Sequence, residues 1–186
     1  TTTALTVLRA FGLECNVSSS MQNNPLDLKN KVVSNALKRK KSDDVLEIIS
    51  NFGDPMMPVC AGMLSSASKK CHVILAGGTQ MLAVLQLGKH IGYNVKNSAI
   101  GCTSYIIDDS QAKFLETVQQ IDDIAVLSCD PCLHNSRHFG FRSYADGFVK
   151  EGAGAGGAII ASLLKTENSI EKLFTLFEQE YERIST

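Results

Sequence analysis

Regularly spaced apolar residues predict helices in the first third of the chain. Apolar side chains recur there every three or four positions, which is the spacing along one face of an α-helix. Leu5, Leu8 and Phe11 share such a face, and Gly12 is a typical helix terminator. The same pattern predicts helices over residues 2–12, 26–40, 42–53 and 55–63. In the helix over 26–40 the apolar side chains expected to face inward are Leu28, Val32, Val33, Ala36 and Leu37.

The pattern changes in the middle of the chain, where short apolar runs alternate with helical segments. The runs 71–76, 98–103 and 124–128 have the length and the continuous hydrophobicity of buried strands. Helices are expected over 80–90, after a cap at Asp109 or Ser110, and from the glycines near 154 to about Leu164. This alternation predicts an α/β fold with a parallel sheet flanked by helices in a Rossmann-like, three-layer arrangement, and with helical N-terminal and C-terminal segments.

Capping residues help to place the ends of the helices. Ser42 is the expected cap of the helix that follows it, because a serine oxygen accepts hydrogen bonds from the first free N–H groups. Asn168, with Glu171 three positions later, is the expected cap of the C-terminal helix. Residues 129–150 follow neither period and are expected to be irregular. We predict a single α/β domain over residues 1–186.

Composition and charge exclude several classes of function. The chain has 186 residues, of which 44% are hydrophobic and 20% charged, so it can bury a core. A net charge of −1 gives no electrostatic reason to expect nucleic acid binding. No apolar run approaches the roughly 20 residues of a membrane span, so we expect no membrane association. The 6 cysteines, several in apolar surroundings, indicate reduced thiols in a cytoplasmic protein.

One stretch combines a carboxylate with a cluster of glycines. Glu151 stands directly before Gly152, and Gly154 leads into an apolar helix. Glycine lets a backbone approach a ligand closely, and a helix N-terminus favours anions such as phosphate. The stretch formally matches the dinucleotide pattern G-x-G-x-x-G, but neither a strand nor an acidic residue follows at the required distance, which disfavours such a site. Close packing of the helix stays open as an alternative role for the glycines.

A second glycine turn follows the first predicted strand. Gly77, Gly78 and Thr79 come at the carboxyl end of that strand, where ligands of open α/β sheets bind. A tight turn that needs glycine only for its geometry explains the same residues equally well. We therefore predict a binding role for the turn without excluding the geometric one.

Cysteine and histidine side chains gather in one short segment. Cys129, Cys132, His134 and His138 are possible zinc ligands, but they lie too close together in the sequence for an ordinary closed tetrahedral site, and we expect no metal. His134 and Ser136 remain candidate binding residues, because they lie on a loop that leads towards Glu151.

Several of these motifs resemble one enzyme family. The segment from Lys150 to Gly157 is similar to the Glu-Gly-x-Gly-Ala signature of nicotinate-nucleotide–dimethylbenzimidazole phosphoribosyltransferases. The segments 148–150 and 76–81 resemble the archaeal branch, and residues 1–4 resemble the end of the Gly-rich motif that opens the second half of these enzymes. Residues 52–54 resemble the Gly-Phe-Glu element, with Asp54 in place of Glu. The resemblance spans nearly the whole chain but only the later part of a full-length member, so we expect a chain that belongs to a longer enzyme.

The resemblance implies a reaction, its partners and its residues. Members of the family transfer phosphoribose from nicotinate mononucleotide to a benzimidazole-type base, without a cofactor and usually as homodimers. It implies that Glu151 is the general base and that the substrates contact Gly77, Gly78, Thr79, Gly152, Gly154, Thr1, Thr2 and Asp54. His134 and Ser136 join them as candidate substrate contacts because of their place on the loop before Glu151. The alternative is a regulatory protein that binds a nucleotide on the same fold without chemistry.

Overall fold

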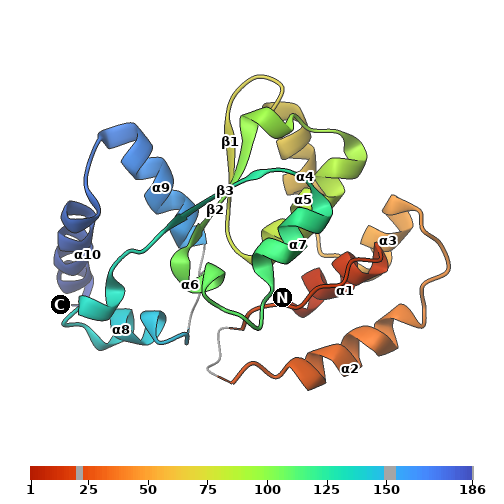
Figure 1. Ribbon diagram of the computed structural model, residues 1–186, viewed down its shortest axis with the longest axis horizontal. Coiled ribbons are helices and arrows are strands. Elements are labelled where there is room, and N and C mark those ends of the chain that lie inside the picture. Colours follow the sequence, from red (N-terminus) through yellow and green to blue (C-terminus); the bar gives the residue numbers. More distant parts are fainter. Residues whose placement is uncertain (20–22, 149–153, 186) are drawn as a thin grey trace.

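The computed structural model describes residues 1–19, 23–148 and 154–185, and they form an α/β fold (Figure 1). Its sheet contains three parallel strands in the order β1 (Val73–Ala76), β2 (Ser98–Thr103) and β3 (Ala125–Cys129). This confirms the predicted fold class, and the predicted strands agree with the observed ones to within a few residues.

Helices among the described residues lie on both sides of this sheet, and further helices lie near the two ends of the chain. They are α1 (Thr2–Ala10), α2 (Leu26–Leu37), α3 (Val45–Phe52), α4 (Met56–Ala67), α5 (Thr79–Ile91), α6 (Ser104–Ile107), α7 (Phe114–Ile121), α8 (Phe139–Ala145), α9 (Ala155–Thr166) and α10 (Ile170–Ser185). Two short 3₁₀ helices, η1 (Val95–Asn97) and η2 (Leu133–Asn135), lie between them.

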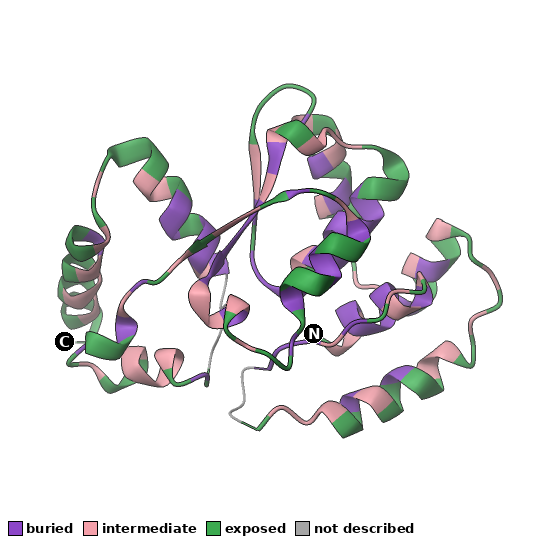
Figure 2. Ribbon diagram, viewed as in Figure 1, coloured by how far each residue is buried: buried purple, intermediate pink, exposed green. Residues whose placement is uncertain are grey.

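The helices form a layer on each side of the sheet. One layer is α9, which contacts all three strands. The other contains α5, which packs against α1, α4 and α7. Residues 82–88 of α5 are all buried, as expected for a helix that is surrounded on every side. Figure 2 shows the buried residues concentrated in α1, α5 and the central strand β2.

Glycines allow α9 to lie unusually close to the sheet. A Cβ atom on Gly156 would come within 2.1 Å of the carbonyl carbon of Cys102 in β2. A Cβ on Gly157 would come within 2.5 Å of the Cβ of Ala76, at the end of β1. The facing residue in β2 is Gly101, where a Cβ would come within 2.8 Å of the Cα of Gly157. Close packing, the alternative left open by the sequence, is therefore one role of these glycines.

The segment predicted to be irregular contains α8 and η2, and this part of the prediction is wrong. The helix α8 is too short to show a clear period in the sequence. An aromatic side chain of α8 packs on α10: the ring centroids of Phe141 and Tyr181 are 5.0 Å apart. Tertiary contacts of this kind stabilise a short helix that local propensity does not reveal.

The predicted inward face of α2 is also partly wrong. Leu28 is 63% exposed and Val32 is 49% exposed. Lys29 and Val33 are the buried residues of this helix, because they face α1 and the polar chain between α1 and α2. The apolar pattern places Lys29 at the surface. The predicted inward face of α2 is therefore rotated about the helix axis relative to the observed one.

Three predicted caps do not cap the helices for which they were expected. Asp44, and not Ser42, caps α3 through hydrogen bonds from the backbone N–H groups of residues 46 and 47. Ser169 accepts from the backbone N–H of residue 172 at the start of α10, the role expected for Asn168. Asp109 caps only a turn, and α7 begins after Lys113, which has a left-handed backbone. At α3 and α10 an oxygen side chain one or two residues away supplies the contact, whereas α7 begins without a side-chain cap.

The contact between α9 and β2 predicts a large effect of one added methyl group. Gly156→Ala should lower the free energy of unfolding by about 3 kcal/mol, because the new Cβ meets backbone atoms that cannot move aside. Urea denaturation followed by circular dichroism measures the change. Gly62→Ala is the matched control: Gly62 lies within the exposed face of α4 with no atom in the path of a Cβ, so this change should be neutral or slightly stabilising. Equal stabilities of the two variants would contradict the packing described above.

Candidate functional site

The parallel strands bring both glycine segments to one edge of the sheet. We call this the carboxyl edge and define it by the ends of β1, β2 and β3 together with the turn 77–79 and Gly154. Gly77 has a φ of 153° and donates its N–H to the carbonyl oxygen of Gly101 at 3.0 Å. Gly154 has a φ of 71°, and a Cβ on it would come within 2.6 Å of the carbonyl oxygen of Ala76. The turn after β1 and the start of α9 are therefore direct neighbours.

Thr79 connects this edge to the chain that follows α1. It is the first residue of α5 and is 3% exposed. Its hydroxyl lies 3.5 Å from the hydroxyl of Ser18, which is also buried. Two buried hydroxyls thus lie beside the N-terminus of α5, the end of a helix that favours anions.

Lys29 places a buried positive charge next to these hydroxyls. Its ammonium group donates to the carbonyl oxygen of Ser18 at 3.3 Å and to Oδ1 of Asn24 at 2.8 Å. Asn24 in turn donates to the carbonyl oxygen of Val17 at 2.7 Å, and this hydrogen bond holds the Asn24 side chain next to Lys29. These hydrogen bonds stabilise the buried charge, which would be costly without polar partners. The sequence analysis missed Lys29, and the signal available was its position four residues before the buried Val33.

Thr1, Thr2 and Asp54 make local contacts within the described residues. The carbonyl oxygen of Thr1 accepts from the backbone N–H of Leu5 at 2.9 Å. Asp54 also has a local role, because its Oδ1 accepts from the backbone N–H groups of Met56 and Met57 and so caps α4. Thr2 accepts the hydroxyl of Thr6 with its carbonyl oxygen. Substrate contacts of Thr1, Thr2 and Asp54 stay predictions.

Glu151 and Gly152 lie outside the described residues. The structure therefore places the neighbours of the signature, above all Gly154 and the start of α9, but not the proposed base itself. The role of Glu151 rests on the sequence.

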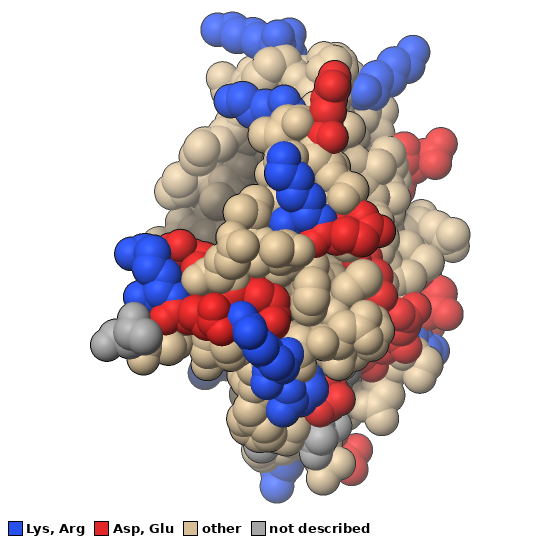
Figure 3. Space-filling model, turned by 90° about the vertical axis from the view of Figure 1, so that its left-hand side faces the viewer, with Lys and Arg blue, Asp and Glu red and all other residues tan. Residues whose placement is uncertain are grey.

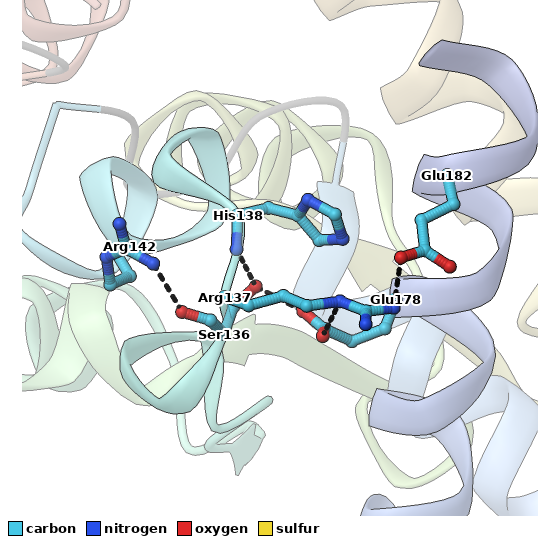
Figure 4. A network of polar contacts seen from close by, with 6 residues as sticks. All are labelled: Ser136, Arg137, His138, Arg142, Glu178 and Glu182. Carbon is cyan, nitrogen blue, oxygen red and sulfur yellow. Dashed lines mark hydrogen bonds and ion pairs between the residues drawn. The ribbon is translucent and has the colours of Figure 1, made fainter. Parts of the chain in front are cut away.

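Ser136 belongs to a network that fastens the loop before α8 to α10 (Figure 4). Its buried hydroxyl donates to the carboxylate of Glu178 and accepts from the backbone N–H of His138 at 3.0 Å. Arg137 pairs with the same carboxylate at 3.2 Å and also with Glu182, one turn further along α10. Ser136 thus has its hydroxyl engaged within the protein, while His134 is exposed in η2. Neither residue is placed against the turn 77–79 by a contact in the structure.

A second contact holds the loop that follows β3. The hydroxyl of Tyr105 donates to Oδ1 of Asp130 at 3.2 Å and accepts from the backbone N–H of Leu133 at 3.3 Å. Burial, and then the nearby carboxylate of Asp130, raise the pKa of the Tyr105 hydroxyl, so this group stays a donor at neutral pH. The loop is therefore anchored at both ends, on α6 and on α10.

The described residues hold neither a metal cluster nor a membrane span. No three His, Cys, Asp or Glu side chains among them gather closely enough to bind a metal ion. No helix in the described ranges is long and apolar enough to cross a membrane. On the face seen in Figure 3, from the side of α10, acidic and basic side chains are intermixed, so this face has no patch of a single sign.

Comparisons with known proteins find similarity to archaeal proteins named UPF0284. The chain is 42% identical to a UPF0284 protein of Archaeoglobus fulgidus over 184 residues, which are 99% of this chain and 52% of that protein. It is 39% identical to one of Pyrococcus abyssi and 38% identical to one of Methanopyrus kandleri, with 96% and 98% of this chain covered. The chain spans about half the length of these relatives. Their name states no activity, and no protein-family model matches the chain.

The surroundings of Lys29 predict that it binds an anionic ligand. Lys29→Met keeps the aliphatic stem but removes the charge. If nicotinate mononucleotide is the ligand, as the resemblance implies, its binding should weaken roughly 10- to 100-fold through loss of a charge-assisted hydrogen bond. Isothermal titration calorimetry of the full-length protein measures this. Lys31→Met, at an exposed position of the same helix, is the control and should leave the affinity unchanged. If both variants bind as tightly as the unaltered protein, Lys29 has no part in anion binding.

Proposed function

We propose that the full-length protein is a phosphoribosyltransferase that moves phosphoribose from nicotinate mononucleotide to a benzimidazole-type base. The observation that carries this proposal is that two glycine segments, 77–78 and 154–157, meet at one edge of a parallel sheet. The buried Lys29 is linked to this edge through Ser18 and Thr79. Backbone N–H groups, hydroxyls and a buried ammonium are the groups that bind a sugar phosphate. The resemblance of the segment around Glu151 supplies the reaction.

The reaction needs few protein groups. The bond between C1′ of the ribose and the pyridinium nitrogen breaks, and nicotinate leaves with the electron pair of that bond. One ring nitrogen of the acceptor attacks C1′ and forms the new glycosidic bond. The second ring nitrogen then loses its proton, which we assign to the carboxylate of Glu151 as general base. The product is an α-ribazole-phosphate-like nucleotide, as used for the lower ligand of cobamides.

The described residues contribute binding and orientation to this scheme. The N-termini of α5 and α9 present N–H groups with the positive ends of their helix dipoles, which favour the phosphate and the ionised form of a nearby carboxylate. Holding two planar rings and a sugar in register supplies much of the remaining acceleration. We propose a homodimer as the working form, on the resemblance alone.

The rival function is a nucleotide-binding regulatory protein on the same fold. Such a protein would bind a nucleotide with the same glycine segments, hydroxyls and Lys29, but it would catalyse no reaction. Binding of nicotinate mononucleotide with no release of nicotinate, whichever benzimidazole is supplied, favours this rival.

The proposal predicts that one oxygen-to-nitrogen exchange abolishes most of the activity. Glu151→Gln keeps the size of the side chain but removes the base, so kcat should fall by a factor of roughly 10² to 10⁴. Chromatographic assay of nicotinate release by the full-length protein, with dimethylbenzimidazole as acceptor, measures the rate. Glu167→Gln, at the exposed C-terminal end of α9, is the control and should retain the full rate. A Glu151→Gln protein with unchanged kcat would show that the role assigned to Glu151 is wrong.

A further inference from the structure

The apolar side of α2 is wider than the surface that α1 covers. Successive residues of an α-helix are turned by about 100°, so the apolar residues of α2 occupy roughly half of its circumference. In order around the helix they are Leu28, Val32, Ala36, Val33 and Leu37. Val33 is fully buried, and α1 is the element on which α2 packs most. At the other end of the arc, Leu28 is 63% exposed and Val32 is 49% exposed.

Leu28 and Val32 together form a strip, which we call the α2 strip. They are four positions apart, so they lie one above the other on one side of the helix. Single exposed apolar residues are ordinary on a protein surface, whereas neighbouring ones that continue a buried face indicate a contact surface. Figure 1 shows α2 at the outer edge of the described residues, alongside α1, and Figure 2 shows exposed residues along its length.

The opposite flank of α2 has the composition expected of a surface in water. Asp27 and Ser34 lie on that flank, and both are exposed. A surface helix that makes a single contact has polar residues on both flanks of its buried face. In α2 one flank is polar and the other is the α2 strip, and this asymmetry indicates a second contact on the side of the strip.

The length of the relatives identifies what can make this contact. The chain spans about half the length of the UPF0284 proteins of Archaeoglobus fulgidus and Pyrococcus abyssi. The remaining part of such a protein is thus comparable in size to the chain itself. Two parts of one polypeptide that pack together commonly bury roughly 600–1,500 Å² between them, which requires apolar surface on each part.

We propose that the part of the full-length protein outside residues 1–186 packs on the α2 strip. The inference does not depend on the proposed reaction, because it rests on the exposure of Leu28 and Val32 and on the length of the relatives. It has a consequence for Lys29, which lies within the same apolar arc and is buried. A helix held on two sides keeps the Lys29 ammonium next to Ser18 and Asn24.

Two positions on α2 allow a matched test in the full-length protein. Val32 belongs to the strip, and Ser34 is exposed about 160° further around the helix. Val32→Cys and Ser34→Cys are small changes, and the rate at which iodoacetamide modifies each new thiol reports its exposure. Peptide mapping by mass spectrometry separates these thiols from the other cysteines. A photoreactive p-benzoylphenylalanine at position 32 then identifies the segment that covers the strip.

The expected result is a modification rate at least about tenfold lower for Val32→Cys than for Ser34→Cys, because a thiol in a packed contact reacts only after local opening. The cross-linked product should have the mass of a single polypeptide and should join position 32 to a peptide outside residues 1–186. Equal modification rates would overturn the proposal. So would a product with the mass of two polypeptides, which assigns the strip to a second copy, or cross-links confined to residues 1–186.

Discussion

The close contact between the start of α9 and the sheet is the constraint on which the rest of the structure depends. Side chains normally keep a helix and a sheet about 10 Å apart, as they do for stacked sheets. Here Gly156 and Gly157 remove that spacing, so the backbone of α9 lies directly on Cys102 and Ala76. The contact orders the start of α9 against the ends of β1 and β2, and it thereby fixes where the glycine signature can meet the turn after β1.

This contact gives the glycines two compatible roles. Their close packing explains why residues 154–157 carry no large side chain, without reference to a ligand. The same packing leaves the N-terminus of α9 at the carboxyl edge, beside the buried Gly77, Gly78 and Thr79. A motif that serves packing can therefore also serve binding, and the proposed phosphoribosyl transfer needs both.

The sequence predicted the elements of the fold better than it predicted the contacts between them. The strands β1 to β3 follow from short apolar runs, although β2 is buried along nearly its whole length whereas β1 and β3 are partly exposed. The rotation of α2 does not, because Lys29 is buried by polar partners in the non-helical segment before α2, which no periodic pattern records. The helix α8 was missed for a related reason: its aromatic residues are held by α10. Of the predicted site residues, the structure brings together the turn 77–79 and Gly154, whereas Thr1, Thr2 and Asp54 have local contacts at the starts of α1 and α4.

If the proposed function is right, the phosphate of a bound nucleotide lies at the carboxyl edge between α9 and Lys29. A crystal structure of the full-length protein with bound nicotinate mononucleotide tests it most directly. The account predicts the 5′-phosphate within hydrogen-bond distance of backbone N–H groups in the glycine segments or of the Lys29 ammonium, with C1′ facing Glu151. A nucleotide bound at another surface, or bound at this edge with its ribose turned away from Glu151, would contradict it.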